Sequence, residues 1–222
     1  MPQPGSPVNK ATLKEQRAAQ RAKKLEVFHR QQKRSKRNRL IGITSAIVGG
    51  VAVIGLVVTM VVLTPQAPNY AGGDGAAIEG VLTYENGNGH VETGVTYPQT
   101  PPTGGEHNPA WLNCGVYDQP VPSENAVHSL EHGAIWVTYD PSMSAAELDA
   151  LKALMPSDYI VLSPFEGLPS PIVLSAWNAQ LQVESTDDPR IEPFFQQYWK
   201  SGSAPELGAS CSGAIDAPGK VS

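Results

Sequence analysis

A long apolar segment is the first clear pattern along the chain. Residues 40–63 are 24 consecutive residues without a single charge. As a helix they would extend about 36 Å at ~1.5 Å per residue, which crosses a ~30 Å hydrocarbon layer with some tilt. A cleaved signal peptide is the competing interpretation, but its apolar core is usually only about 7–15 residues long. The pattern therefore predicts one N-terminal transmembrane helix over residues 40–63.

Shorter elements follow a Pro/Gly-rich stretch that has no hydrophobic periodicity. Residues 64–77 are predicted to be a flexible linker, residues 78–200 a single compact domain, and residues 201–222 a C-terminal tail. β-Branched and aromatic content predicts strands, whereas helical periodicity with capping residues predicts helices. The expected strands are residues 80–85, 90–98, 134–139, 158–164 and 171–178, and the expected helices are residues 124–132, 144–155 and 190–200.

Capping residues mark the ends of two of these helices. Ser123 is the predicted N-cap and Gly133 the predicted C′ residue of the first helix, while Ser144 and Glu147 form a capping box for the second. The resulting order, β-β-α-β-α-β-β-α, predicts an α+β domain with a mixed β-sheet and two or three helices. The C-terminal β-α-β-β-α part also fits a thioredoxin-like arrangement.

Charge is sharply segregated along the chain, although the net charge is only −5. Residues 1–39 hold 12 Lys and Arg against 2 acidic residues, whereas residues 64–222 hold 4 against 19. The basic cluster at residues 33–39 directly precedes the apolar segment, which predicts a cytoplasmic N-terminus and an extracytoplasmic C-terminal domain at the plasma membrane. A domain this acidic would repel phosphate, so the composition excludes a nucleic-acid partner.

Small residues recur every four positions in the apolar segment. Gly42, Ala46 and Gly50 share one helix face and would let a second copy of the helix approach closely. A homodimer through this transmembrane packing face is therefore one predicted association, and the membrane itself is another. The basic N-terminal segment could also hold anionic lipid headgroups, although we favour its role as a topology signal.

Both cysteines lie on the predicted extracytoplasmic side. Cys114 and Cys211 are expected to form one disulfide bond, because exported compartments are oxidising. Closing so long a loop would stabilise the fold by about 4–5 kcal/mol in the chain-entropy model, and it would tether residues 201–222 to the domain. A free Cys114 acting as a soft metal ligand is the alternative. A CxxC motif is missing, so thiol redox catalysis has no support.

Four of the five histidines fall within 43 consecutive residues of the predicted extracytoplasmic domain. His128 and His132 are four residues apart, which places both rings on one face of a helix. His90 and His107 lie in Gly-flanked segments that could bring further imidazoles to the same ion, and imidazole suits copper and zinc. Glu131 could accept a hydrogen bond from a ligating imidazole and so orient it. The alternative is that the histidines are structural and bond the carbonyl groups at a helix end.

Residues 128–132, HSLEH, also fit the H-x-x-E-H pattern of inverted zinc peptidases, in which Glu131 would be the general base. Those enzymes carry the motif inside a long helix, whereas Gly133 is expected to end this one. The sequence has no G-x-S-x-G elbow, no P-loop and no G-x-G-x-x-G after a strand. A non-catalytic domain is therefore favoured over an enzyme.

Two longer motifs carry a family resemblance. The stretch TYPQTPPTGGEHNPAWLNCGVY, followed by VHSLEHGAIWVTYD, resembles a bacterial and largely actinobacterial family of single-pass membrane proteins defined only as domain of unknown function 3105. The shared elements are Pro101 to His107, Gly115 to Tyr117 and His128 to Gly133, and the resemblance covers roughly residues 78–200. It implies an exported domain behind an N-terminal anchor and emphasises the three motif histidines, but it supplies no activity.

Three functions are compatible with these patterns. The first is a metal-binding module for storage, delivery or sensing, in which His90, His107, His128 and His132 hold one ion, with copper ahead of zinc. Met143 could add a thioether ligand for Cu(I). The second is an envelope scaffold or accessory subunit of a membrane complex, with structural histidines and a membrane or cell-envelope protein as partner. A metal-dependent hydrolase ranks third.

Overall fold

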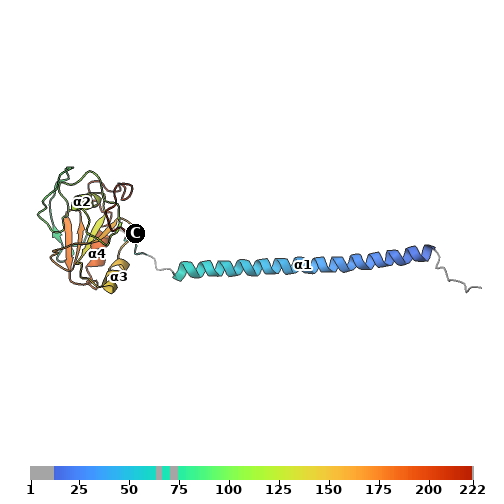
Figure 1. The fold of residues 1–222 in the computed structure, drawn as a ribbon. Coiled ribbons are helices and arrows are strands. Elements are labelled where there is room, and N and C mark those ends of the chain that lie inside the picture. The colour runs from blue at the N-terminus through green and yellow to red at the C-terminus, as the bar shows by residue number, and fades with distance from the viewer. Residues whose placement is uncertain (1–12, 64–66, 71–74, 222) are drawn as a thin grey trace, which may run out of the picture. The chain divides into compact units, whose positions relative to one another are not determined.

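The computed structural model describes residues 13–63, 67–70 and 75–221 (Figure 1). Internal contacts divide the chain into one unit from Met1 to Pro65 and a second from Gln66 to Ser222. The first unit contains helix α1, and the second contains every other helix and strand of the described residues. The apolar segment and the histidine cluster therefore belong to different units.

Helix α1, Leu13–Leu63, is a single helix of 51 residues. It includes the predicted span at residues 40–63 and begins well before it, because the preceding basic stretch is rich in Ala, Lys, Arg and Gln, which favour helix. Length and composition make the helix a candidate membrane span or signal sequence. The hydroxyls of Thr44 and Thr59 donate to backbone carbonyls one turn earlier, so both are satisfied within the helix.

The small-residue face of α1 is open in this single chain. Nothing lies within 4 Å of the position that a Cβ atom would take at Gly42 or Gly50. Ala46, between them on the same face, is exposed. Self-association through this transmembrane packing face stays a prediction.

The second unit is built on a mixed six-stranded sheet in the order β1-β6-β5-β3-β4-β2. Strands β2, β4 and β3 pair in parallel, whereas β3, β5, β6 and β1 pair antiparallel in turn. This confirms the predicted α+β class with a mixed sheet. The strands are β1 Leu82–Thr83, β2 Gly115–Val116, β3 Ile135–Tyr139, β4 Ile160–Pro164, β5 Ile172–Ala176 and β6 Ala179–Val183.

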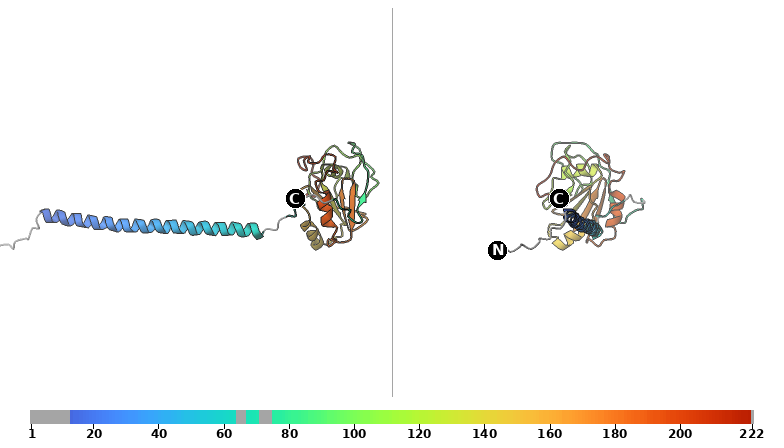
Figure 2. Two further views of the ribbon diagram at one scale, coloured as in Figure 1. Left: turned by 180° about the vertical axis from the view of Figure 1, so that it is seen from behind. Right: turned by 90° about the vertical axis from the view of Figure 1, so that its right-hand side faces the viewer.

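Helices cover both faces of this sheet, and each face has its own core (Figure 2). Side chains alternate along β3, so Ile135 and Val137 pack with α3 and α4, whereas Trp136 packs with α2. The helices are α2 Ser123–Glu131, α3 Ala145–Ala153 and α4 Ile191–Tyr198. The elements β3, α3, β4 and β5 follow one another in the predicted strand–helix–strand–strand order. One additional strand, β6, precedes the final helix.

The structure confirms one predicted N-terminal cap and corrects the other. Ser144 and Glu147 form the capping box of α3, because each side chain accepts a hydrogen bond from the other residue's backbone N–H (3.3 and 3.0 Å). The predicted Ser123 cap is wrong, since Ser123 is the first residue of α2. The N-cap is Pro122, whose extended backbone leads into the helix without a side-chain capping bond.

Two strand predictions also require correction. Residues 90–98 do not form a strand, because His90 instead makes an isolated bridge to His107 in the Pro/Gly-rich loop. The predicted strand at residues 171–178 ends at Ala176. Asn178 then adopts a left-handed backbone (φ +62°) in a tight turn that leads into the unpredicted strand β6.

The predicted linker, residues 64–77, lies partly outside the described residues. Within its described part, Tyr70 is buried, and its hydroxyl donates to the carbonyl oxygen of Leu154 (2.7 Å). Its ring also stacks on Phe195, with 5.3 Å between ring centroids. Tyr70 therefore packs into the core of the second unit, and the flexibility of the rest of the segment stays a prediction.

Candidate metal centre

Three segments of the chain bring the predicted site residues together. His90 and His107 both lie in the loop between β1 and β2, where they bridge each other through bonds from the Val91 N–H to the His107 carbonyl (2.8 Å) and from the His107 N–H to the Gly89 carbonyl (2.9 Å). His128 and Glu131 lie on α2, and His132 is the C-cap of that helix. The third segment is the C-terminal tail, which follows α4 and returns to α2.

Gly133 ends α2 directly after the cluster, as predicted. Its φ of +99° is a left-handed conformation that favours glycine. The Gly133 N–H donates to the Leu130 carbonyl (2.9 Å), and the Ala134 N–H donates to the Ser129 carbonyl (3.0 Å), which is the Schellman arrangement. The helix is therefore too short to carry the H-x-x-E-H motif in its interior, as a zinc peptidase would require.

One group of potential ligand atoms is formed by His90, His107, His128 and Glu131. One atom from each residue lies within 4.8 Å of those of the other three. His107, His128 and Glu131 are buried, whereas the side chain of His90 is 41% exposed. Three imidazoles and one carboxylate at this separation could hold one transition-metal ion, with His90 on the solvent side.

The backbone partners of the buried rings show which ring nitrogen carries a proton. The Nδ1–H groups of His107, His128 and His132 each donate to a carbonyl oxygen at 2.7 Å, those of Gly105, Asn108 and Ser210 respectively. A carbonyl oxygen can only accept, so each Nδ1 carries the proton, and Nε2 carries the lone pair in the neutral ring. Metal-ligating histidines are oriented in this way by backbone carbonyls.

The buried carboxylate of Glu131 adds an electrostatic requirement. One of its oxygens lies 2.9 Å from Nε2 of His107 and 3.5 Å from Nε2 of His90. Because Nδ1 of His107 already holds its proton, a neutral ring would direct a lone pair at a carboxylate oxygen. A shared proton or a metal cation between the two groups removes that repulsion. Glu131 therefore lies among the potential ligands as well as beside the His107 imidazole, and its role in orienting a ligating ring stays a prediction.

Burial favours the neutral form of the His128 ring, which is the form that can bind a metal ion. Desolvation lowers the pKa of His128, opposed by its hydrogen bond to the Asn108 carbonyl, while the neighbouring His132, His107 and His90 lower it further. The neutral imidazole is thereby favoured, and only the neutral ring can donate a lone pair to a metal.

A second group consists of His128, His132 and Glu206, again with potential ligand atoms within 4.8 Å of one another. The Nε2 atom of His132 lies 3.4 Å from a carboxylate oxygen of Glu206. Glu206 is placed there by the tail, because its N–H donates to the Glu131 carbonyl (3.0 Å) and the Gly208 N–H donates to the His132 carbonyl (3.3 Å). These bonds also satisfy carbonyls at the end of α2. Sequence patterns gave no sign of Glu206.

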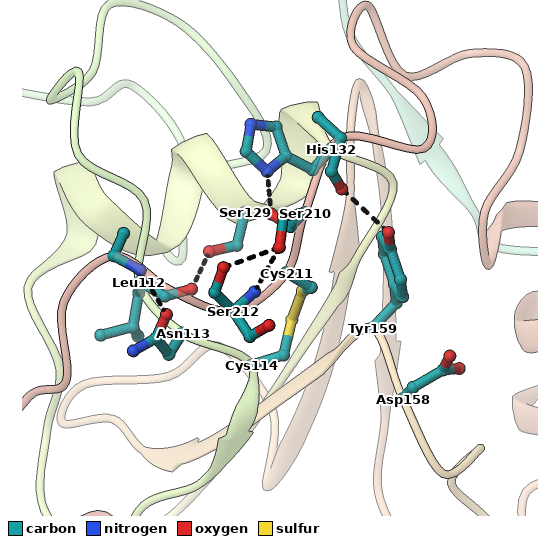
Figure 3. The surroundings of a disulfide bond; sticks show 12 residues. Leu112, Asn113, Cys114, Ser129, His132, Asp158, Tyr159, Ser210, Cys211 and Ser212 are labelled. Atoms are coloured by element: carbon teal, nitrogen blue, oxygen red, sulfur yellow. Dashed lines mark hydrogen bonds between the residues drawn. A yellow bond between two sulfur atoms is a disulfide. The ribbon is translucent and has the colours of Figure 1, made fainter.

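The disulfide holds this tail against the site (Figure 3). Cys114 and Cys211 are bonded, with their Cα atoms 5.3 Å apart, and the Cys114 N–H donates to the Cys211 carbonyl (2.7 Å). Ser210, the neighbour of Cys211, accepts the hydrogen bond from Nδ1 of His132. Cys114 is thus paired, and it belongs to neither group of potential ligands, contrary to the alternative of a thiolate ligand.

Two tryptophans enclose the rings of the cluster. Trp177 lies edge-on to His107 (5.9 Å between ring centroids), and Trp111 lies 5.8 Å from His128 and 5.1 Å from His132. The indole N–H of Trp111 is buried and has no acceptor among the described residues. Met143 instead packs against the core on the α3 and α4 side of the sheet, whereas α2 packs on the other side, so the structure does not place it as a thioether ligand.

The second unit is thus an α+β domain with a buried His/Glu cluster at the end of α2. Residues 90–213 match the family described as protein of unknown function (DUF3105), and because this match spans more than half of the chain, the protein belongs to that family. The match includes all four clustered histidines, both glutamates of the two groups and both cysteines. No curated protein and no solved structure is significantly similar to the chain.

Proposed function

We propose that this protein is a membrane-anchored, non-catalytic metal-binding protein. One transition-metal ion is held by His90, His107, His128 and Glu131, for storage, delivery or sensing at the outer face of the plasma membrane. The observation that carries the proposal is the contact between Nε2 of His107 and the buried carboxylate of Glu131 (2.9 Å), because two groups oriented in this way need a metal cation or a shared proton between them, and His90 and His128 place two further imidazoles around it.

The donor set favours a divalent ion of borderline softness. Imidazole nitrogens suit both Cu²⁺ and Zn²⁺, and a carboxylate oxygen suits either ion better than Cu(I). Divalent copper binds a given nitrogen and oxygen site more tightly than zinc, following the Irving–Williams order. We therefore place copper ahead of zinc.

The anchor and the orientation rest on α1. Its apolar part is long enough to cross a membrane, and the basic residues lie on the N-terminal side of that part, which supports a cytoplasmic N-terminus. The acidic domain would then face the extracytoplasmic side, where a disulfide between Cys114 and Cys211 is stable.

A scaffold with structural histidines is the second candidate. It is supported by the same three bonds from Nδ1 to backbone carbonyls, because they join the end of α2 to the loop at Gly105 and Asn108 and to the tail at Ser210. In that case an envelope or membrane protein would be the partner, and replacing His128 would destabilise the fold without any dependence on metal.

Equilibrium titration of the full-length chain in detergent micelles separates these two functions. Wild-type protein, stripped with a chelator, is expected to bind one Cu²⁺ or Zn²⁺ with a dissociation constant below about 1 µM. His107→Ala should weaken this affinity by at least roughly 10- to 100-fold, the loss that follows when only an outer-shell partner of a ligand is removed, because it removes a buried nitrogen ligand itself. His29→Ala, which removes an exposed histidine from α1, is the matched control and should bind as wild type does. The scaffold is supported instead if neither ion binds in a histidine-dependent way.

A further inference from the structure

The two groups of potential ligands adjoin each other and share His128. The ring of His128 lies 4.9 Å from that of His107 and 4.6 Å from that of His132, between centroids. Its Nδ1 is engaged by the Asn108 carbonyl, which leaves Nε2 as the ring nitrogen for a metal. His128 can therefore serve one ion at a time, in one group or in the other.

The second group also brings an imidazole nitrogen close to a carboxylate. Nδ1 of His132 donates its proton to the Ser210 carbonyl, which leaves Nε2 as the ring nitrogen for a metal, and Nε2 lies 3.4 Å from a carboxylate oxygen of Glu206. A metal cation bound by both groups would be held by a nitrogen lone pair and a negative charge. His132 is buried, whereas the Glu206 side chain is 46% exposed, so this group reaches solvent through Glu206.

Trp111 leaves an unsatisfied donor in the neighbourhood of the second group. Its buried indole N–H lacks an acceptor among the described residues, although its ring lies against both His128 and His132. Buried donors are nearly always satisfied, by protein or by ordered water. An ordered water molecule would supply this acceptor, and a site with three protein ligands has room for a water molecule in its coordination shell.

We propose that His128, His132 and Glu206 form a second metal position, and that an ion passes between the two positions by ligand exchange at His128. In the exchange, the ion gives up His132 and Glu206 and gains His90, His107 and Glu131, while His128 stays bound. The cluster then has exposed residues at both ends, His90 and Glu206, with buried ligands between them. Such an arrangement suits a protein that accepts an ion and delivers it.

This inference rests on the proposed function, and Cu²⁺ titration of full-length variants tests it separately. The variant His107→Ala/Glu131→Gln removes the first position and is expected to retain one Cu²⁺ at the second, with at least tenfold weaker affinity than wild type. Adding His132→Ala and Glu206→Gln should abolish the remaining binding. Circular dichroism confirms that each variant is folded.

A milder variant keeps the test valid if the multiple replacements do not fold. Glu206→Gln changes a half-exposed side chain, and it should alter the rate at which wild-type protein releases Cu²⁺ to an external chelator by at least threefold. Glu166→Gln, at another exposed position, is the matched control and should release as wild type does. The second position is overturned if Glu206→Gln releases Cu²⁺ at the wild-type rate, or if the folded first-position variant binds no Cu²⁺. Wild-type protein that binds no Cu²⁺ would overturn the proposed function itself.

Discussion

Saturation with Cu²⁺ is expected to raise the melting temperature of the folded unit by about 8–16 °C. A ligand that binds only the folded state at 1,000 times its dissociation constant contributes ~4 kcal/mol. For a domain of this size, each kcal/mol shifts the melting temperature by about 2–4 °C. The measurement is thermal unfolding of the full-length chain, followed by circular dichroism, with and without the ion.

The control for this shift is a chain that folds but lacks two buried ligands. In the double variant His107→Ala/His128→Ala the shift should vanish, and in wild-type protein a chelator should reverse it. His29→Ala should retain the full shift. An equal rise in the double variant would mean that Cu²⁺ acts at some other place, and the cluster would then not be the binding site.

Loss of the disulfide is expected to lower the free energy of unfolding by about 4–5 kcal/mol. The bond joins residues 97 positions apart, and the chain-entropy model gives this stabilisation for a loop of that length. The double variant Cys114→Ser/Cys211→Ser should therefore unfold at a much lower urea concentration than wild type. It should also bind metal at the second position more weakly, because the tail that carries Glu206 and the Ser210 carbonyl loses its covalent tether.

The disulfide prediction has its own control. Wild-type protein treated with a reductant, with both thiols confirmed by mass spectrometry, should match the double serine variant in its urea midpoint. If the midpoint stays at the oxidised value, the tail is held by its hydrogen bonds alone. The contacts from Asn113 and Cys114 to the tail would then be sufficient without the covalent bond.

Sequence patterns predicted the elements whose ends or conformations are determined by residues close to one another in the chain. The capping box of Ser144 and Glu147 defines the start of α3. Helix α2 ends at Gly133, because the backbone there takes a positive φ that favours glycine. The dense β-branched runs of β3 and β4 were recognised because they are buried on both faces.

Elements that depend on distant partners were missed. Strand β2 has only two residues and is defined by pairing with β4 rather than by any pattern of its own. Strand β6 includes Gln180, a polar residue that is buried because its amide donates to the Pro101 carbonyl (2.8 Å). Such a residue weakens the apolar pattern of a strand, and its partner lies 79 positions away.

Sequence patterns identified the four histidines that the structure brings together, but not that they fall into two groups of potential ligands. Spacing alone placed His128 and His132 on one helix face and suggested a single ion. The end of the helix instead directs His132 toward the tail, where it meets Glu206, while His128 stays with His107. Glu206 comes from a stretch without periodicity, and only the disulfide-held path of the tail brings it to α2. No local signal could have identified it.

X-ray absorption at the copper edge of the loaded full-length chain tests the central claim most directly. We predict an ion coordinated by nitrogen and oxygen atoms only, with the outer-shell scattering of two or more imidazoles and no sulfur, since both cysteines are bonded to each other. A spectrum with sulfur ligands, or one that is unchanged in His107→Ala/His128→Ala, would contradict it.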